Sequence, residues 1–411
     1  MSHQQNGKEP ALMGINSLHT TSDGQIPRLT GWREFAQSLT ESLPSFLTWR
    51  NGTDLPRSAF EIRERGTLAR LSLWAKTAGS KILDVYMQLP KPGQNRLLHA
   101  PHFLFLLRST NSPGFEQLHN YYTFVEAEEY LSGKRDRPPA GNWTALGDRY
   151  FPSEDSQPSS SEMTNPLLSG AVSIAPFARG ILVDAWSPYL KDCWTGLYEL
   201  GEIERYNLEE VEHIRQCLES SLDYIESVSP TVIDTIRSSV QVIGVIKSSM
   251  NSTAVSSMSV RRALGSLILA NLLAGSWRPD DVCDAIVHET IHSIIYQLEL
   301  LNPLLKDGSS SASVQVQSPW SGRSLDLYSF THACFVWFGL WNFWVMHSHS
   351  MPEATALGDK AERGFLRGSL SALRTPELRD RLQPSVLRAI EEMFEYVRSN
   401  SHHQGDQRIV S

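Results

Sequence analysis

The sequence predicts a mainly α fold with a minor β component (α+β), in which a large helical scaffold surrounds one HExxH metal helix. Three observations predict it. Apolar residues recur at helical spacing through much of the chain, runs of β-branched residues are few and short, and His288-Glu289-Thr290-Ile291-His292 lies inside a long helical pattern. With 411 residues, 41% of them hydrophobic and 20% charged, the chain has ample material for a folded core.

Composition excludes several classes of function. A formal net charge of -8 gives no electrostatic case for binding nucleic acid. The first thirty residues are polar and lack the pattern of a secretory signal. The apolar run from Ala333 to Met346 is too short to cross a bilayer and carries Asn342, so we expect a buried helix and no membrane contact. The four cysteines are widely spaced without a C-x-x-C pair, which argues against disulfides and thiolate zinc and favours a reducing cytoplasm.

The N-terminal half of the chain divides by composition. Residues 1–30 are predicted to be a flexible leader and 31–151 a helical N-terminal region, with helical spacing from Trp32 and again over 58–88 and 97–107. His99 and His102 flank Pro101 and so lack helical register, and we expect both to be structural. Ser, Pro and acidic residues over 152–165 predict a loop.

Residues 166–400 are predicted to form the metal-binding catalytic region, followed by a flexible tail over 401–411. Short strands are expected over 172–176 and 180–184, an amphipathic helix over 206–228 with Asn207 as its N-cap, and a buried strand over 240–246. The run 264–272 predicts a strand or a short helix. Arg278-Pro279-Asp280-Asp281 then begins a helix that should end near Asn302-Pro303.

The H-E-x-x-H motif lies on this last helix. Helical side chains four apart share a face, so His288 and His292 can bind one metal ion. Glu289 is placed to bind the metal, position a water or move a proton. Asp284 lies one turn earlier, where it can orient His288, although a solvated acidic residue is the commoner explanation. A chance polar patch on an amphipathic helix is the alternative for the motif as a whole.

Two histidines do not make a stable site, so the third ligand decides the class of protein. A metzincin would have Gly and His where Ile295 and Leu298 stand. A thermolysin-like enzyme would use a Glu from a following helix, but Glu299 lies on the same helix, about two turns after His292, and we expect it not to reach the same ion.

The remaining candidate for the third ligand is His332, a lone polar residue that opens the strongly apolar helix. The alternative is a buried histidine with a single hydrogen bond. His347 and His349 follow at the polar end of that helix, where we expect them to be exposed.

The segment 286–344 resembles the HExxH-motif proteins that are encoded beside ribosomal peptide natural-product genes, and the match extends over roughly 240–400. It rests on the entry into the metal helix at Ile286-Val287-His288, on Ser318-Pro319-Trp320 with Arg323 close behind, and on His332 entering an aromatic helix that ends in Phe343-Trp344. The chain departs from the family pattern at three positions: Ser321 replaces Arg, Ser324 replaces the Pro after Arg323, and Ala333 replaces Gly.

The resemblance implies an oxidoreductase, an iron(II) and 2-oxoglutarate-dependent dioxygenase that β-hydroxylates a residue in a peptide or peptide-like substrate during natural-product biosynthesis. Carried over by position, it implies metal ligands at His288, His292 and His332. It also implies Arg323 as the partner of the distal carboxylate of 2-oxoglutarate, which a guanidinium can bind with two hydrogen bonds. Three histidines differ from the usual triad of two histidines and one carboxylate, so Glu289 is expected as a ligand or as a supporting group.

Two alternatives remain open from the residues alone. A zinc metallopeptidase would use Glu289 as general base on a metal-bound water. A non-catalytic scaffold that binds a peptide would need no metal, and the tryptophans of the aromatic helix would then be core residues.

Overall fold

The computed structural model describes residues 30–50, 54–152, 173–190, 203–248, 256–274, 277–306, 314–346, 352–367 and 375–407. Helices account for most of these residues, and the strands form small sheets, so the predicted mainly α fold with a minor β component is confirmed. The predicted leader up to residue 29 and nearly all of the predicted loop at 152–165 lie outside the described residues.

The N-terminal region is helical, as predicted. Its helices are α1 (Thr30–Phe46), α2 (Leu55–Ala78), α3 (Lys81–Gln88), α4 (Lys91–His99), α5 (Pro101–Ser109) and α6 (Phe115–Leu131). Helices α2 to α6 enclose a hydrophobic core of their own, with Trp74, Phe103 and Tyr121 fully buried. A small antiparallel sheet follows, which the sequence did not predict over its first two strands: β1 (Asn142–Trp143), β2 (Arg149–Phe151) and β3 (Ser173–Ile174).

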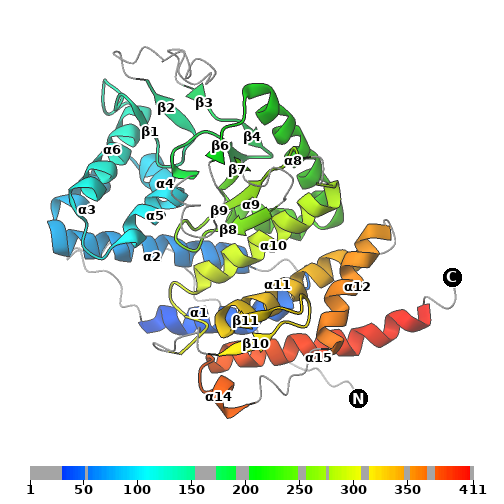
Figure 1. Cartoon of the computed structure of the whole chain (residues 1–411). Helices are drawn as coiled ribbons and strands as arrows, with labels where there is room; N and C mark the ends of the chain where they lie inside the picture. The colour runs from blue at the N-terminus through cyan, green and yellow to red at the C-terminus, as the bar shows by residue number, and fades with distance from the viewer. Residues whose placement is uncertain are drawn as a thin grey trace, which may run out of the picture.

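The larger sheet lies at the centre of the upper half of the molecule (Figure 1). Its strands follow the order β4 (Phe177–Ala178), β5 (Ile181–Asp184), β7 (Val242–Ser248), β9 (Ser266–Ala270) and β8 (Ser256–Ser259), and β6 (Ile203–Glu204) pairs with β7. Strands β5, β7 and β9 are parallel and buried, which explains why they read as continuous apolar runs. The predicted strands at 180–184 and 240–246 are therefore confirmed, and the run 264–272, for which a strand or a short helix was expected, forms a strand.

Helices α8 (Leu208–Val228) and α9 (Pro230–Ser239) cover this sheet on one side (Figure 1). Asn207 caps α8 as predicted: its Oδ1 accepts from the Glu210 amide at 2.9 Å, and the Glu210 carboxylate accepts from the Asn207 amide at 2.8 Å. The apolar stripe Val211, Ile214, Leu218, Leu222 and Ile225 is buried in the main core, which confirms the amphipathic pattern.

Helix α10 (Pro279–Leu298) carries the motif and crosses the middle of the molecule, between the sheet above and a group of helices below (Figure 1). These helices are α1, α11 (Leu327–Val345), α12 (Pro352–Arg367), α14 (Pro376–Arg379) and α15 (Pro384–Gln407), and the hairpin of β10 (Gln315–Gln317) and β11 (Ser324–Asp326) leads into α11. Helix α15 continues to Gln407 and so extends into the predicted tail.

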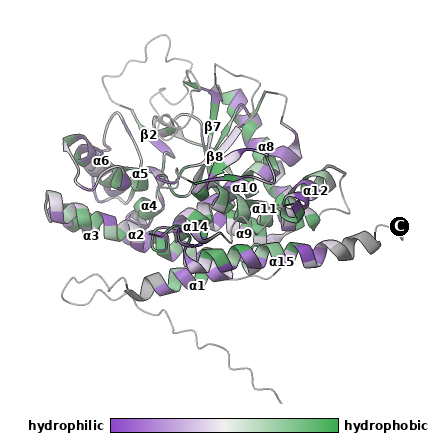
Figure 2. Cartoon of the chain, turned by 60° about the horizontal axis from the view of Figure 1, so that its bottom comes forward, coloured by the Kyte–Doolittle hydropathy of each residue, from purple (hydrophilic) through white to green (hydrophobic). Residues whose placement is uncertain are grey.

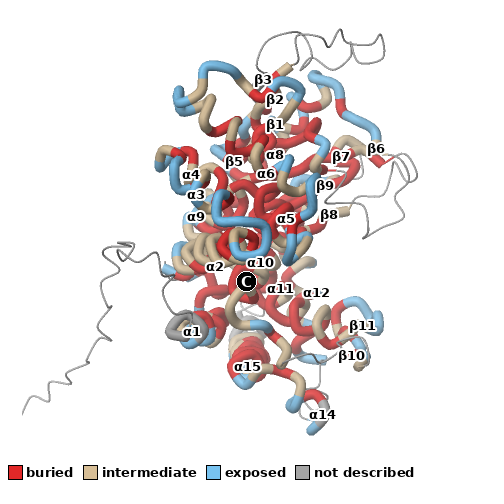
Figure 3. Tube along the Cα trace, turned by 90° about the vertical axis from the view of Figure 1, so that its left-hand side faces the viewer, coloured by how far each residue is buried: buried red, intermediate tan, exposed pale blue. Residues whose placement is uncertain are grey.

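Most residues of helices α10 and α11 are buried (Figure 3), and apolar residues dominate both (Figure 2). They approach closely at Gly339 of α11, where an added Cβ would lie 2.6 Å from Ile291 Cδ1. Among the described residues, no helix combines the length and apolar character needed to span a bilayer.

Candidate metal centre

The start of α10 is fixed by local chemistry that the sequence predicts. Pro279 occupies the first turn, and the Asp281 carboxylate accepts from the backbone amide of Arg278 at 3.1 Å, which satisfies a donor that the helix leaves unpaired. From this start the helix runs uninterrupted through the motif, with Ile286, Ile291 and Ile294 in the core. It ends at Leu298, four residues before Asn302.

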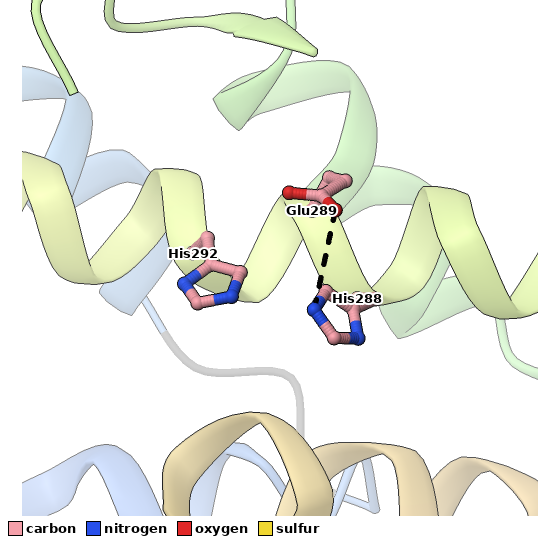
Figure 4. A group of neighbouring side chains, drawn as sticks. All are labelled: His288, Glu289 and His292. Carbon is pink, nitrogen blue, oxygen red and sulfur yellow. Dashed lines mark ion pairs between the residues drawn. The ribbon is translucent and has the colours of Figure 1, made fainter. Parts of the chain in front are cut away.

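The three motif side chains lie close together on α10, as Figure 4 shows. Ligand atoms of His288, Glu289 and His292 all lie within 4.8 Å of one another. His288 Nε2 is 4.0 Å from Glu289 Oε1, and the two imidazole rings hang from the same side of α10 with centroids 5.0 Å apart. The side chain of Glu289 is buried, whereas that of His288 is 33% exposed, so the group opens to solvent on the His288 side.

His332 joins this group from α11. Its Nδ1 lies 2.9 Å from Nδ1 of His292, and the two rings stack with centroids 5.1 Å apart. His332 itself is buried at 2% exposure. Helix α11 packs against α10 along this stretch, and the two helices also approach closely about two turns further on, where Gly339 faces Ile291.

Glu299, at the C-cap of α10, faces the other nitrogen of His332. Its Oε2 is 3.5 Å from His332 Nε2 and accepts a hydrogen bond of 2.6 Å from the Tyr328 hydroxyl. Burial alone would raise the pKa of Glu299, but His332, Arg261 and Tyr328 together hold that pKa below its ordinary value. The carboxylate is therefore ionised behind His332, in the arrangement that orients metal-binding histidines in other proteins.

Strand β8 supplies a partner for Glu289. Ser257 Oγ donates to Glu289 Oε1 at 2.8 Å, and β8 packs alongside α10. Where β8 ends, Arg261 Nε lies 3.7 Å from Glu299 Oε2. Strand β8 and the turn after it thus lie along α10, from Glu289 to the C-terminal end of the helix.

The electrostatics favour a neutral imidazole at His292. Burial, and then the neighbouring His288 and His332, hold the pKa of His292 well below its ordinary value. Tyr296 stacks on His292, and burial together with Glu289 and Glu299 raises the pKa of its hydroxyl to about 12. Because a histidine binds a metal only in its neutral form, this environment prepares His292 as a ligand.

The side chains present fit a divalent metal ion. Two nitrogens bound at right angles to one ion, each about 2.0–2.1 Å away, would be about 2.9 Å apart, close to the observed separation of the Nδ1 atoms of His292 and His332. His332 Nε2 is buried and makes no hydrogen bond within the described part of the chain, and Glu299 is the charged group that faces it. Among the described residues, the side chains grouped closely enough to hold the ion are those of His288, Glu289 and His292. His332 contacts His292 but does not belong to that group, so its assignment as the third ligand stays a prediction.

Arg323 occupies a different environment. It is exposed in the turn that joins β10 to β11, where its carbonyl accepts from the Ser318 amide at 2.8 Å and its own amide donates to Ser321 Oγ at 3.3 Å. The length of β11 separates this turn from α11 and His332. The assignment of Arg323 to a carboxylate stays a prediction, and Arg261 is the arginine that contacts the surroundings of His332.

The other candidate residues divide as follows. His99 and His102 lie on α4 and α5; His102 stacks on Tyr189, and the described residues place neither histidine in a group that could hold a metal. Asp284 accepts from Trp344 Nε1 at 2.6 Å, and burial raises its pKa. His347 and His349 lie outside the described residues.

Sequence comparison adds no relative: neither a family model nor a curated protein matches this chain. The resemblance to the HExxH-motif peptide-modifying proteins therefore stays a prediction. The grouping of His288, Glu289 and His292 agrees with an HExxH metal site and does not by itself identify a family.

Proposed function

We propose that this protein is an iron(II) and 2-oxoglutarate-dependent enzyme that hydroxylates a residue of a peptide or peptide-like substrate. The observation that carries the proposal is the contact between His292 and His332, whose Nδ1 atoms lie 2.9 Å apart. Imidazole nitrogens are common metal ligands, and two of them from neighbouring helices lie close enough here to share one ion; the resemblance of the sequence favours iron among the metals. Bound iron would supply the oxidation chemistry with dioxygen and 2-oxoglutarate.

The protein's own residues have distinct roles in this proposal. Glu299 and Tyr328 orient His332, so that its Nδ1 faces His292. Ser257 holds the Glu289 carboxylate in place, where it can accept or return a proton. The apolar surroundings of α10 and α11 exclude water from the side of the site that faces the core.

A peptide substrate is supported by the position of β8. Within the described residues, β8 is an edge strand: it pairs with β9 and with no other strand. An edge strand offers unpaired backbone groups to which an extended peptide can add. Because Ser257 of this strand contacts Glu289, a peptide added there would lie beside the proposed metal centre.

The test begins with protein purified without oxygen and loaded with iron(II). We expect one iron per chain and the conversion of 2-oxoglutarate to succinate under air. His332→Ala should lose both, whereas His119→Ala, which changes a histidine of the N-terminal region, should lose neither. Iron binding that survives in His332→Ala would refute the assignment of the third ligand, and the absence of succinate in the wild type would refute the oxygenase.

A zinc hydrolase is the second candidate, and the position of Glu289 favours it. A buried carboxylate 4.0 Å from His288 Nε2 is placed to serve as general base, and three histidines are a known set of ligands for catalytic zinc. Cleavage of peptides by the zinc-loaded wild type, lost in Glu289→Gln and unaccompanied by succinate formation with iron, would favour hydrolysis. A chain that binds neither metal stoichiometrically would be a peptide-binding scaffold.

We also propose that the protein works in the cytoplasm. The three cysteines that the structure describes, Cys217, Cys283 and Cys334, are all free thiols. Free thiols agree with a reducing cytoplasm.

A further inference from the structure

We infer that Arg261, braced by Arg108, binds a carboxylate group at the edge of the metal centre. The inference rests on the proposed function for the identity of the neighbouring site, but its own evidence is the arrangement of arginines at the end of β8. The ligand it calls for is a carboxylate, carried either by a small 2-oxo acid or by a peptide.

Arg261 lies at the rim of the site. It begins the turn that joins β8 to β9, and its side chain is 52% exposed. The guanidinium lies over the Tyr328 ring, 5.1 Å from the centroid, and its Nε is 3.7 Å from Oε2 of the buried Glu299. Arg261 therefore covers Glu299 from the solvent side, one contact away from His332.

The turn that carries Arg261 is held by a second arginine. Arg108, on α5, donates from Nη1 to the carbonyl oxygen of Arg261 at 2.8 Å. Burial, and then the positive charges of Arg261 and Arg70, lower the pKa of Arg108 to about 10. The backbone that carries Arg261 is thus held in place before any ligand arrives, which lowers the entropic cost of binding.

Positive charge exceeds negative charge at this rim. Glu299 is the one carboxylate among the groups that act on Arg108, and it already accepts from Tyr328 and faces His332. The separation of 3.7 Å between Arg261 and Glu299 is too long for a hydrogen bond, and no side-chain hydrogen bond of Arg261 joins it to the rest of the described chain. A guanidinium has five N–H donors in a planar fork, so Arg261 retains the capacity for a bidentate carboxylate.

Two sources of carboxylate fit this place. A 2-oxo dicarboxylic acid could direct its distal carboxylate to Arg261 from the metal centre. A peptide laid along β8 could direct its C-terminal carboxylate there, because the strand leads from Glu289 to Arg261. Arg323, exposed in its own hairpin, contacts none of these residues in the described structure.

The experiment compares Arg261→Gln with Arg262→Gln, which removes the adjacent exposed arginine. Binding of 2-oxoglutarate is measured by calorimetry. Retention of N-acetylated random hexapeptides, with free or amidated C-termini, is measured on immobilised protein. Both binding measurements are made on metal-free and on zinc-loaded protein. We expect Arg261→Gln to weaken binding of one of the carboxylates by about tenfold or more, and Arg262→Gln to leave it within about twofold. Arg261→Lys, which keeps the charge without the fork, should fall between them.

The outcomes separate the sources and the proposals. A loss for 2-oxoglutarate assigns the small acid, and a loss confined to peptides with a free C-terminus assigns the peptide. Equal binding of both carboxylates by Arg261→Gln and the wild type, or binding of neither by the wild type, overturns the inference. Zinc content is measured on the same samples. If the wild type binds no zinc but its carboxylate binding still depends on Arg261, then the metal centre is wrong and this inference stands.

Discussion

Glu299→Gln tests whether the proposed centre depends on the carboxylate behind His332. The substitution keeps the shape of the side chain and an oxygen that can accept from Tyr328, but it removes the negative charge 3.5 Å from His332 Nε2. Loss of such a supporting carboxylate typically lowers metal affinity 10- to 100-fold. Because 3.5 Å is longer than a strong charge-assisted hydrogen bond, we expect the smaller effect, about tenfold or about 1.4 kcal/mol.

The assay is a competition titration of zinc or iron(II) against a chelator of known affinity. Glu395→Gln, which changes an exposed glutamate on α15, is the matched control and should bind metal like the wild type. Metal affinity in Glu299→Gln equal to that of the control would refute the role of the carboxylate. The same variant also removes the negative charge 3.7 Å from Arg261 Nε, so its carboxylate affinity should rise while its metal affinity falls.

Three further predictions concern stability. Gly339→Ala should lower the unfolding free energy by about 1–3 kcal/mol in denaturant titrations and also weaken metal binding, because a Cβ there would lie 2.6 Å from Ile291. Gly358→Ala on α12, whose nearest neighbour would be 3.6 Å away, should instead be neutral or stabilising by up to about 1 kcal/mol, and equal losses in the two variants would contradict the packing argument. Burial lowers the pKa of His102 to about 3, so the unfolded chain binds a proton between about pH 6.5 and pH 3 that the folded chain does not. Stability should therefore fall as the pH drops below about 6.5, by up to about 1.4 kcal/mol per pH unit, and His102→Phe should show a shallower slope. Asn207→Ala should lower the free energy of unfolding by about 1 kcal/mol, because α8 loses its cap. An unchanged melting temperature would contradict this expectation.

Hydrophobic periodicity predicted the elements whose burial is one-sided or complete. The stripe of α8 and the apolar runs of β7 and β9 were found because each pattern reports a buried face. The motif helix was found for the same reason, and its cap residues placed its start correctly. Its end lies at Leu298, a few residues before the proline at which the sequence placed it, since the last turn closes on Glu299.

The sequence did not predict strand β8, and it therefore did not predict the roles of Ser257 and Arg261, which depend on that strand. Ser256-Ser257-Met258-Ser259 has neither β-branched nor aromatic residues, so its local preference gives no sign of a strand. Pairing with β9 makes it one, because the register joins Ser257 to Leu269 and Met258 to Ile268 along a buried neighbour. The contact of Ser257 with Glu289 and the position of Arg261 both follow from that pairing, which no pattern within the segment encodes.

Glu299 shows why spacing along one helix underdetermines a metal site. Seven residues after His292 is about two turns, and the structure agrees that Glu299 does not join the group formed by His288, Glu289 and His292. Yet α11 crosses α10 so closely that His332 fits between the two positions, with one nitrogen toward His292 and the other toward Glu299. Helix α10 thus places His292 against one nitrogen of His332 and the Glu299 carboxylate against the other. The H-E-x-x-H spacing predicts the helix that carries the motif, but it holds no information on which side chains a second helix places against it, as α11 places His332 against His292.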